Sequence, residues 1–200
     1  MMASIEALRI QEATRYESAE YLGNEAASNV TVETRKTLAE WVLRVTQWCR
    51  YEHETAEMAL SLLDRFMMTA AATDCLKSKR EFQLATVAAI WIASKTCQYV
   101  ALNPQMFIQL SLNGYSLKDI EGMESKMLHA MDWKVNCPTV FAFIHETVNI
   151  LPAELIDEAA KKNLFDLAVV QAQWSLVDHG NLGIKKSVLA FAAVSNAIDV

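Results

Sequence analysis

The twelve residues from Phe82 to Ala93 (FQLATVAAIWIA) constrain the fold more than any other stretch of this chain. Only Gln83 and Thr86 among them are polar. The helical segment that contains them extends over about Arg80–Cys97, and a helix that is apolar on nearly every face needs neighbours on all sides. We therefore expect this segment to be the central helix of an all-α bundle.

The rest of the chain carries the same periodicity. The 200 residues include five glycines and three prolines, and the alternation typical of strands is almost absent. We expect helices at about Ser4–Tyr21, Thr31–Arg50, His53–Met68, Pro104–Leu112, Leu117–Asp132, Thr139–Leu151, Ala153–Val177 and Lys185–Val200. The apolar stripe of the second of these should consist of Leu38, Trp41, Val42, Val45, Trp48 and Cys49, and that of the third should include Ala59, Leu62, Leu63, Phe66 and Met67.

A short break at Asn136–Pro138 is the one credible internal boundary. It divides the chain into an N-terminal helix with its connection (1–30), a first helical unit (31–135) and a second unit (139–200). The last segment, SVLAFAAVSNAI, echoes the earlier LATVAAIWIASK, which suggests a divergent helical repeat. The first unit has about five helices and the second stops after three, so a complete second unit would need more chain.

Composition excludes several classes of protein. The net charge of −6 argues against nucleic acid as the main partner, because phosphate binding needs a basic surface. The N-terminus lacks the apolar core of a signal peptide, and no run reaches the roughly 18 apolar residues of a membrane helix. We expect a soluble intracellular protein. The cysteines form no CxxC pair and should be reduced core thiols; they are Cys49, Cys75, Cys97 and Cys137.

Signals for catalysis are poor. Neither His53–Glu54 nor His145–Glu146 continues into the HExxH zinc motif, and no Glu-x-x-His pair supports a di-iron site. The scattered glycines form no phosphate-binding loop. A Ser/His/Asp triad stays open on sequence alone, although no nucleophile elbow marks one. We expect no catalytic residues, no metal, no cofactor and no small-molecule substrate.

One carboxylate lies within an apolar stripe. Glu124 follows Ile120 by four residues and precedes Met127 by three, so it should be partly buried and need a partner. Lys95, at the end of the central helix, is a candidate partner. Alternatively, Lys95 complements the negative end of its own helix and Glu124 extends to water. Spacing alone does not decide between these.

Arg35 and Asp64 pose a similar question. Each lies near an end of an amphipathic helix, and Asp64 directly follows the apolar pair Leu62–Leu63. An internal ion pair that orients two helices is one interpretation. Two solvated surface charges are the other, and this is the usual outcome for such residues.

At these positions the sequence resembles the cyclin family. TRKTLAEWVLRV resembles the first helix of the cyclin box, ALSLLDRFM the second and LATVAAIWIASK the third, while DIEGMESKMLHAMDWKVNCPTVFAFI resembles the fifth helix, the linker and the start of a second box. The match covers about Thr34–Ile144 and, more loosely, the rest. It implies a cyclin-box helical bundle with one complete five-helix box, an N-terminal helix and a partial second box.

Five positions that recur across cyclins have matching residues in this sequence. The resemblance implies that Arg35 and Asp64 form an internal ion pair, and that Leu84 belongs to the core of the family motif. It places Lys95 and Glu124 at the groove that receives the mobile helix of a kinase. The implied protein is a non-catalytic regulatory subunit of a cyclin-dependent serine/threonine kinase in cell-cycle control, present in nucleus and cytoplasm. The alternative is a cyclin-box protein that acts in transcription through protein or DNA contacts, which the acidic charge and the Lys95/Glu124 set disfavour.

Two further stretches bear on this interpretation. Cyclins often have acidic residues after the lysine of the third helix, whereas Thr96–Gln98 follow it here. The tetrapeptide Lys77–Arg80 (KSKR) could serve as a nuclear signal, but we expect a solvated loop before the central helix.

The sequence also departs from cyclins at the substrate-docking patch of the first box helix. Thr34 and Thr37 occupy positions where many cyclins have Met and Ile, although Leu38 and Trp41 remain. Arg44 stands where an acidic residue commonly receives a basic group of the substrate. We expect a weakened docking patch.

Overall fold

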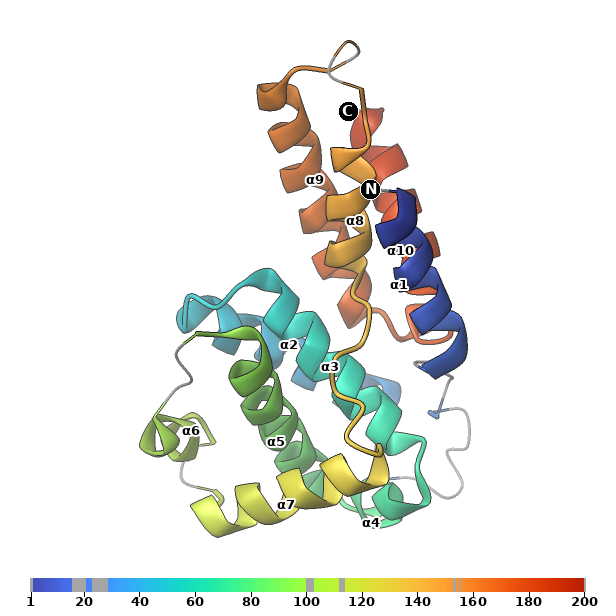
Figure 1. Cartoon of the computed structure of the whole chain (residues 1–200). Coiled ribbons are helices and arrows are strands. Elements are labelled where there is room, and N and C mark those ends of the chain that lie inside the picture. Colours follow the sequence, from blue (N-terminus) through green and yellow to red (C-terminus); the bar gives the residue numbers. More distant parts are fainter. Residues whose placement is uncertain are drawn as a thin grey trace. The chain divides into compact units, whose positions relative to one another are not determined.

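The computed structural model describes residues 2–15, 21–22, 29–99, 103–111, 114–152, 154 and 156–199. Within these residues the protein is all-α, with ten α-helices, two short 3-10 helices and no strand (Figure 1). The chain groups into two compact units. We call Ala19–Asn136 the α5 unit, and Met1–Ser18 together with Cys137–Val200 the α10 unit.

The α5 unit is built around its central helix. Its helices are α2 (Val32–Trp48), α3 (His53–Met67), α4 (Thr73–Lys77), α5 (Lys79–Cys97), α6 (Pro104–Leu110) and α7 (Leu117–Ala130). Every side chain of α5 from Phe82 to Ser94 is buried except that of Gln83, and the helix packs against α2, α3, α4 and α7. The prediction that this segment is a central helix surrounded by others is confirmed.

Side-chain caps fix where several helices begin. Thr31 caps α2 by accepting from the Thr34 amide, and Ser78 caps α5 by accepting from the Glu81 amide. Ser116 and Asp119 form a reciprocal capping box at the start of α7. Hydrogen bonds from the backbone amide and the hydroxyl of Ser116 lower the pKa of the Asp119 carboxyl. These short polar residues set the register of the helices that carry the candidate site.

Lys77–Arg80 does not form the solvated loop that the sequence predicted. Lys77 ends α4, Ser78 caps α5 and Lys79 begins it. The reason is a short helix, α4, which is five residues long and too short for its periodicity to be recognised in sequence. The Lys77, Lys79 and Arg80 side chains are nevertheless exposed.

The buried face of α2 differs from the predicted stripe. It consists of Arg35, Ala39, Val42, Val45 and Thr46. The Trp48 side chain is 64% exposed, and those of Leu38, Trp41 and Cys49 are only half-buried. The prediction failed because hydrophobic periodicity ignores a buried arginine and a buried threonine, both of which have hydrogen-bond partners inside the unit. The α3 stripe, by contrast, is buried as predicted.

The α10 unit combines the first helix of the chain with the last three. These are α1 (Met2–Arg15), α8 (Val140–Asn149), α9 (Glu158–Val177) and α10 (Lys186–Ile198). Helices α8, α9 and α10 pack on one another, and α1 lies against α8. Buried side chains of α8, α9 and α10, among them Phe143, Leu164 and Val194, form its core. No described helix is long and apolar enough to cross a membrane.

The end of α1 and the start of α9 were predicted wrongly. Tyr21 was expected at the end of the first helix but is not helical, and residues 16–20 lie outside the described part. Helix α9 begins at Glu158 rather than at Ala153, because the Asp157 side chain accepts from the Ala160 amide and caps the helix there.

The four cysteines are all free thiols. Cys75 and Cys137 are buried, as expected of core thiols, whereas Cys49 and Cys97 are half-buried. Burial raises the pKa of the Cys75 thiol to about 11, so it stays protonated and unreactive near neutral pH.

Candidate functional site

Lys95 and Glu124 are brought together on neighbouring helices of the α5 unit. Lys95 lies in the last turn of α5 and Glu124 in the middle of α7, and the Lys95 ammonium donates to Glu124 Oε1. The Lys95 side chain is 39% exposed and that of Glu124 is 14% exposed. Glu124 lies next to buried Ile120 and Met127, so the lysine supplies the partner that the carboxylate needs.

A third residue, Trp91, completes this cluster. Its indole Nε1 donates to Glu124 Oε2 over 2.8 Å. The Lys95 Nζ lies 4.8 Å from the centroid of the Trp91 ring, within range of a cation–π interaction. The Phe107 ring of α6 meets the same indole edge-on, with 4.8 Å between centroids. Sequence reasoning missed Trp91, although its position four residues before Lys95 on one helix face could have identified it.

Arg35 and Asp64 form a second ion pair inside the α5 unit. Arg35 Nη2 and Nε donate to the two Asp64 carboxylate oxygens at 2.9 and 3.2 Å, and Arg35 is only 3% exposed. The pair joins α2 to α3. Burial opposes the charge of Arg35, but the adjacent Asp64 carboxylate outweighs it and raises the pKa of the guanidinium.

Tyr21 extends this pair into a network of three residues. Its hydroxyl donates to Asp64 Oδ1 over 2.8 Å. Burial, together with the negative charge of Asp64, raises the pKa of Tyr21 well above its usual value. The phenol therefore stays neutral and continues to donate. No sequence pattern predicts this contact, because Tyr21 lies 43 residues from Asp64 along the chain.

Leu84, the remaining position of the resemblance to cyclins, and the residues that follow Lys95 lie in or directly after α5. Leu84 is buried in α5, at 7% exposure. Thr96 bonds the Ile92 carbonyl of its own helix, and Gln98 Nε2 donates to the buried Thr55 hydroxyl over 2.6 Å. The residues after Lys95 therefore offer no carboxylate beside it, which is the departure noted in the sequence.

The predicted docking patch lies along one face of α2. Arg44 and Thr37 are exposed, while Thr34, Leu38 and Trp41 are half-buried. The two threonine hydroxyls are engaged locally: Thr34 with the Thr31 hydroxyl at 3.0 Å, and Thr37 with the Glu33 carbonyl at 2.9 Å. Both hydroxyls bond within the N-terminal part of α2 and its cap, and they offer polar groups where a docking trough would be apolar.

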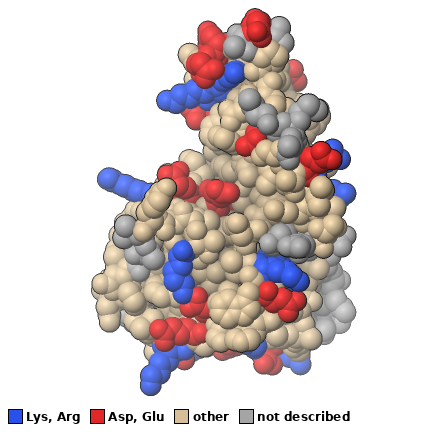
Figure 2. Space-filling view, in the orientation of Figure 1, with Lys and Arg blue, Asp and Glu red and all other residues tan. Residues whose placement is uncertain are grey.

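Among the described residues on the face shown in Figure 2, charges of both signs are interspersed and form no basic stripe of the kind that follows a nucleic-acid backbone. Among the described residues, no group of three or more His, Cys, Asp or Glu side chains could hold a metal ion.

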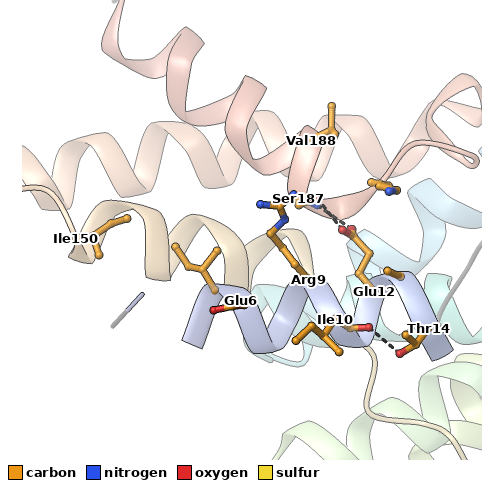
Figure 3. Close-up of a pocket in the computed structure, with 11 residues that line it drawn as sticks. Glu6, Arg9, Ile10, Glu12, Thr14, Ile150, Ser187 and Val188 are labelled. Carbon is orange, nitrogen blue, oxygen red and sulfur yellow. Dashed lines mark hydrogen bonds between the residues drawn. The ribbon is translucent and has the colours of Figure 1, made fainter. Parts of the chain in front are cut away.

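A groove of about 760 Å³ lies in the α10 unit. Its lining includes Ile5, Ile10 and Val188, and Figure 3 shows Glu12 directed from α1 toward the start of α10. There the Glu12 carboxylate accepts from the Ser187 amide at 2.9 Å and from its hydroxyl at 2.7 Å. Because both oxygens accept from Ser187, this carboxylate has a structural role at the start of α10.

Comparison with known proteins supports the resemblance to cyclins. Residues 3–136 match the family described as "Cyclin, N-terminal domain". The chain is 26% identical over 175 residues to G2/mitotic-specific cyclin-1 of Antirrhinum majus, covering 88% of this chain and 34% of that protein. It is 29% identical over 169 residues to putative cyclin-B3-1 of Arabidopsis thaliana, covering 84% and 40%. The chain thus spans well under half the length of these curated relatives.

Two solved structures share the fold. A viral cyclin from herpesvirus saimiri superposes with a TM-score of 0.79 at 18% identity, covering 98% of this chain and 81% of that one. A chain of the CAK complex from Chaetomium thermophilum, bound to ATP-γ-S, superposes with a TM-score of 0.62 at 16% identity, covering 98% and 60%. Cyclins regulate kinases and are not themselves enzymes. With the family match over residues 3–136 and the cyclin fold over nearly its whole length, this chain belongs to the cyclin family.

Proposed function

We propose that this cyclin binds and activates a cyclin-dependent serine/threonine kinase in cell-cycle control. The observation that carries the proposal is the Lys95–Glu124 pair. A partly exposed ammonium is held in place at the junction of α5 and α7, on a unit whose central helix is buried from Phe82 to Ser94 except at Gln83. Lys95 and Glu124 also coincide with the kinase-facing positions that the family resemblance assigns.

The physical role of such a surface is to select one conformation of the kinase. A preformed helical bundle loses little conformational entropy when it binds, so it favours a partner whose mobile helix has settled in place. Ordering that helix would bring together the Lys–Glu pair of the kinase that aligns the ATP phosphates. Structural similarity to a chain of the CAK complex, which was solved with an ATP analogue, is consistent with this class of partner.

The test is affinity capture by the tagged full chain, with identification of the retained kinase and assay of its activity. Removal of both Lys95 and Glu124 to alanine should weaken kinase binding by roughly 2 kcal/mol or more, about 30-fold, as expected of a central contact. The matched control is the double alanine variant of the exposed pair Lys134–Asp132, which should bind normally. Full kinase activation by the first variant, or salt-sensitive retention of DNA in place of a kinase, would contradict the proposal.

We further propose that the protein acts in both nucleus and cytoplasm. The exposed Lys77, Lys79 and Arg80 side chains could contribute to nuclear entry. Imaging of a fluorescent fusion, with and without these three cations, tests this.

A further inference from the structure

We infer that Trp91 is the positioning residue of the kinase-binding site, and that it acts by fixing the Glu124 carboxylate, which in turn holds Lys95. The inference rests on the proposed function. It assigns unequal roles to the pair: Lys95 is the group presented to the partner, while Glu124 and Trp91 set its position.

The hydrogen bonds support this order of roles. Glu124 Oε1 accepts from Lys95 and Oε2 accepts from the Trp91 indole, so each carboxylate oxygen already has a donor within the chain. With 14% of its side chain exposed, Glu124 offers little surface to a partner, whereas Lys95 offers 39%. An ammonium has three donor hydrogens, and the bond to Glu124 uses one of them. The lysine therefore retains donors for a partner, and the glutamate anchors it.

Trp91 is placed to rigidify both of the other side chains. It lies four residues before Lys95 on α5, is 8% exposed and is held by the Phe107 ring of α6. Its ring lies beneath the Lys95 ammonium and its N–H bonds to Glu124. A long lysine side chain that is fixed before binding loses less rotamer freedom when a partner arrives. Leucine or phenylalanine at position 91 could fill space but could not donate to the carboxylate.

The conservative test is Trp91→Phe, which keeps an aromatic ring and removes the indole N–H. Binding to the kinase identified by the capture experiment should weaken roughly tenfold, the range for loss of one hydrogen bond to a charged group. In a Glu124→Ala background the same substitution should have no additional effect, because the carboxylate through which Trp91 acts is gone. Trp174→Phe, at a tryptophan that is 73% exposed in the α10 unit, is the matched control and should bind normally.

A second measurement needs no partner and no variant. In the free protein the Trp91 indole proton should exchange with solvent much more slowly than that of Trp174, since it is bonded to a carboxylate. Exchange at the rate of Trp174 would overturn the inference, even if Trp91→Phe failed to fold.

The remaining outcomes separate the inference from the proposed function. If Lys95→Ala weakens kinase binding and Trp91→Phe does not, the positioning role is overturned and the proposed function stands. An equal loss from Trp91→Phe with and without Glu124 would show that Trp91 does not act through Glu124, which also overturns the inference. If neither Lys95→Ala nor Trp91→Phe weakens binding, the kinase is bound through another surface and the inference fails. If the unaltered chain captures no kinase, the proposed function itself fails.

Discussion

At the scale of single residues, the Arg35–Asp64 pair determines how α2 and α3 meet. Two charges at 3% and 7% side-chain exposure are stable inside the unit only as partners. Asp64 also accepts from Tyr21, so one carboxylate joins both helices and the segment that precedes them.

Substitution of either partner should therefore be costly. Arg35→Ala or Asp64→Ala is expected to lower the free energy of unfolding by roughly 3–5 kcal/mol, because each leaves a buried charge without its partner. Thermal or chemical denaturation measures this. Lys134→Ala, which breaks an exposed pair with Asp132, should change stability by less than about 1 kcal/mol. Unchanged melting of both buried-pair variants would mean that the two charges are solvated in solution.

Only the resemblance to cyclins predicted which residues form the two ion pairs. Spacing placed Glu124 within an apolar stripe but left its partner open, because a carboxylate can also extend to water. Trp91 was treated as core, and periodicity cannot show that one edge of an indole faces a carboxylate across two helices. The geometry of a site depends on tertiary contacts, to which periodicity is blind.

At the scale of helices, boundaries were predictable where a capping residue stood directly before an apolar repeat. Thr31 and Ser116 are such cases. The start of α9 was predicted wrongly because hydrophobic periodicity does not register Asp157, the polar residue that caps the helix. The face of α2 was misjudged because its buried side includes Arg35, which hydropathy counts as polar.

Helix α10 begins without a side-chain cap of its own. Its N-cap residue, Lys185, makes no capping bond, and Glu12 of α1 accepts from Ser187 instead. Glu12→Ala should destabilise the first turn of α10 by about 1–2 kcal/mol, the usual worth of an N-cap. Amide exchange at Ser187 and Val188 should accelerate accordingly.

Two further variants make that test specific. Glu6→Ala, at an exposed position of the same helix and groove, should leave these amides unchanged. Lys185→Ser should restore their protection in the Glu12→Ala background by supplying a local cap. Amides that exchange normally in the Glu12→Ala protein would show that α10 does not depend on α1.

The α2 face should dock substrates poorly. An Arg-x-Leu peptide needs an apolar trough and an acidic partner for its arginine, but Thr34 and Thr37 carry hydroxyls and the exposed Arg44 adds a like charge. Each lost apolar contact is worth on the order of 1–2 kcal/mol, so a micromolar site should become millimolar or weaker. Because Leu38 and Trp41 are half-buried rather than in the core, some apolar surface remains.

Titration with a fluorescent peptide tests this directly. The triple variant Thr34→Met, Thr37→Ile, Arg44→Glu should restore measurable binding. Saturable micromolar binding by the unaltered chain, abolished by Trp41→Ala, would refute the prediction.

At the scale of the whole molecule, the two units differ in how well they cover their apolar side chains. Of the thirteen large hydrophobic side chains that are exposed in the described residues, nine belong to the α10 unit, among them Leu167, Trp174 and Phe191. In the α5 unit the central helix is buried from Phe82 to Ser94 except at Gln83. Burial of apolar surface is the main stabilising contribution, so the α5 unit should be the more stable of the two.

We therefore expect two levels of protection in hydrogen exchange under mild denaturant. Amides of α9 and α10 should exchange at lower denaturant concentration than those of α5, because the α10 unit opens without unfolding the α5 unit.

Each core substitution should lower the exchange protection of one unit only. Phe143→Ala, at 2% exposure in α8, should lower protection in α9 and α10 only, and Phe82→Ala, at 0% exposure, should lower that of α5. Each should cost about 3–5 kcal/mol in its own unit. A single transition, in which both variants lower the exchange protection of all amides equally, would show that the two units unfold as one. Separate levels would mean that the Lys95–Glu124 site, which lies entirely within the α5 unit, stays folded while the α10 unit opens.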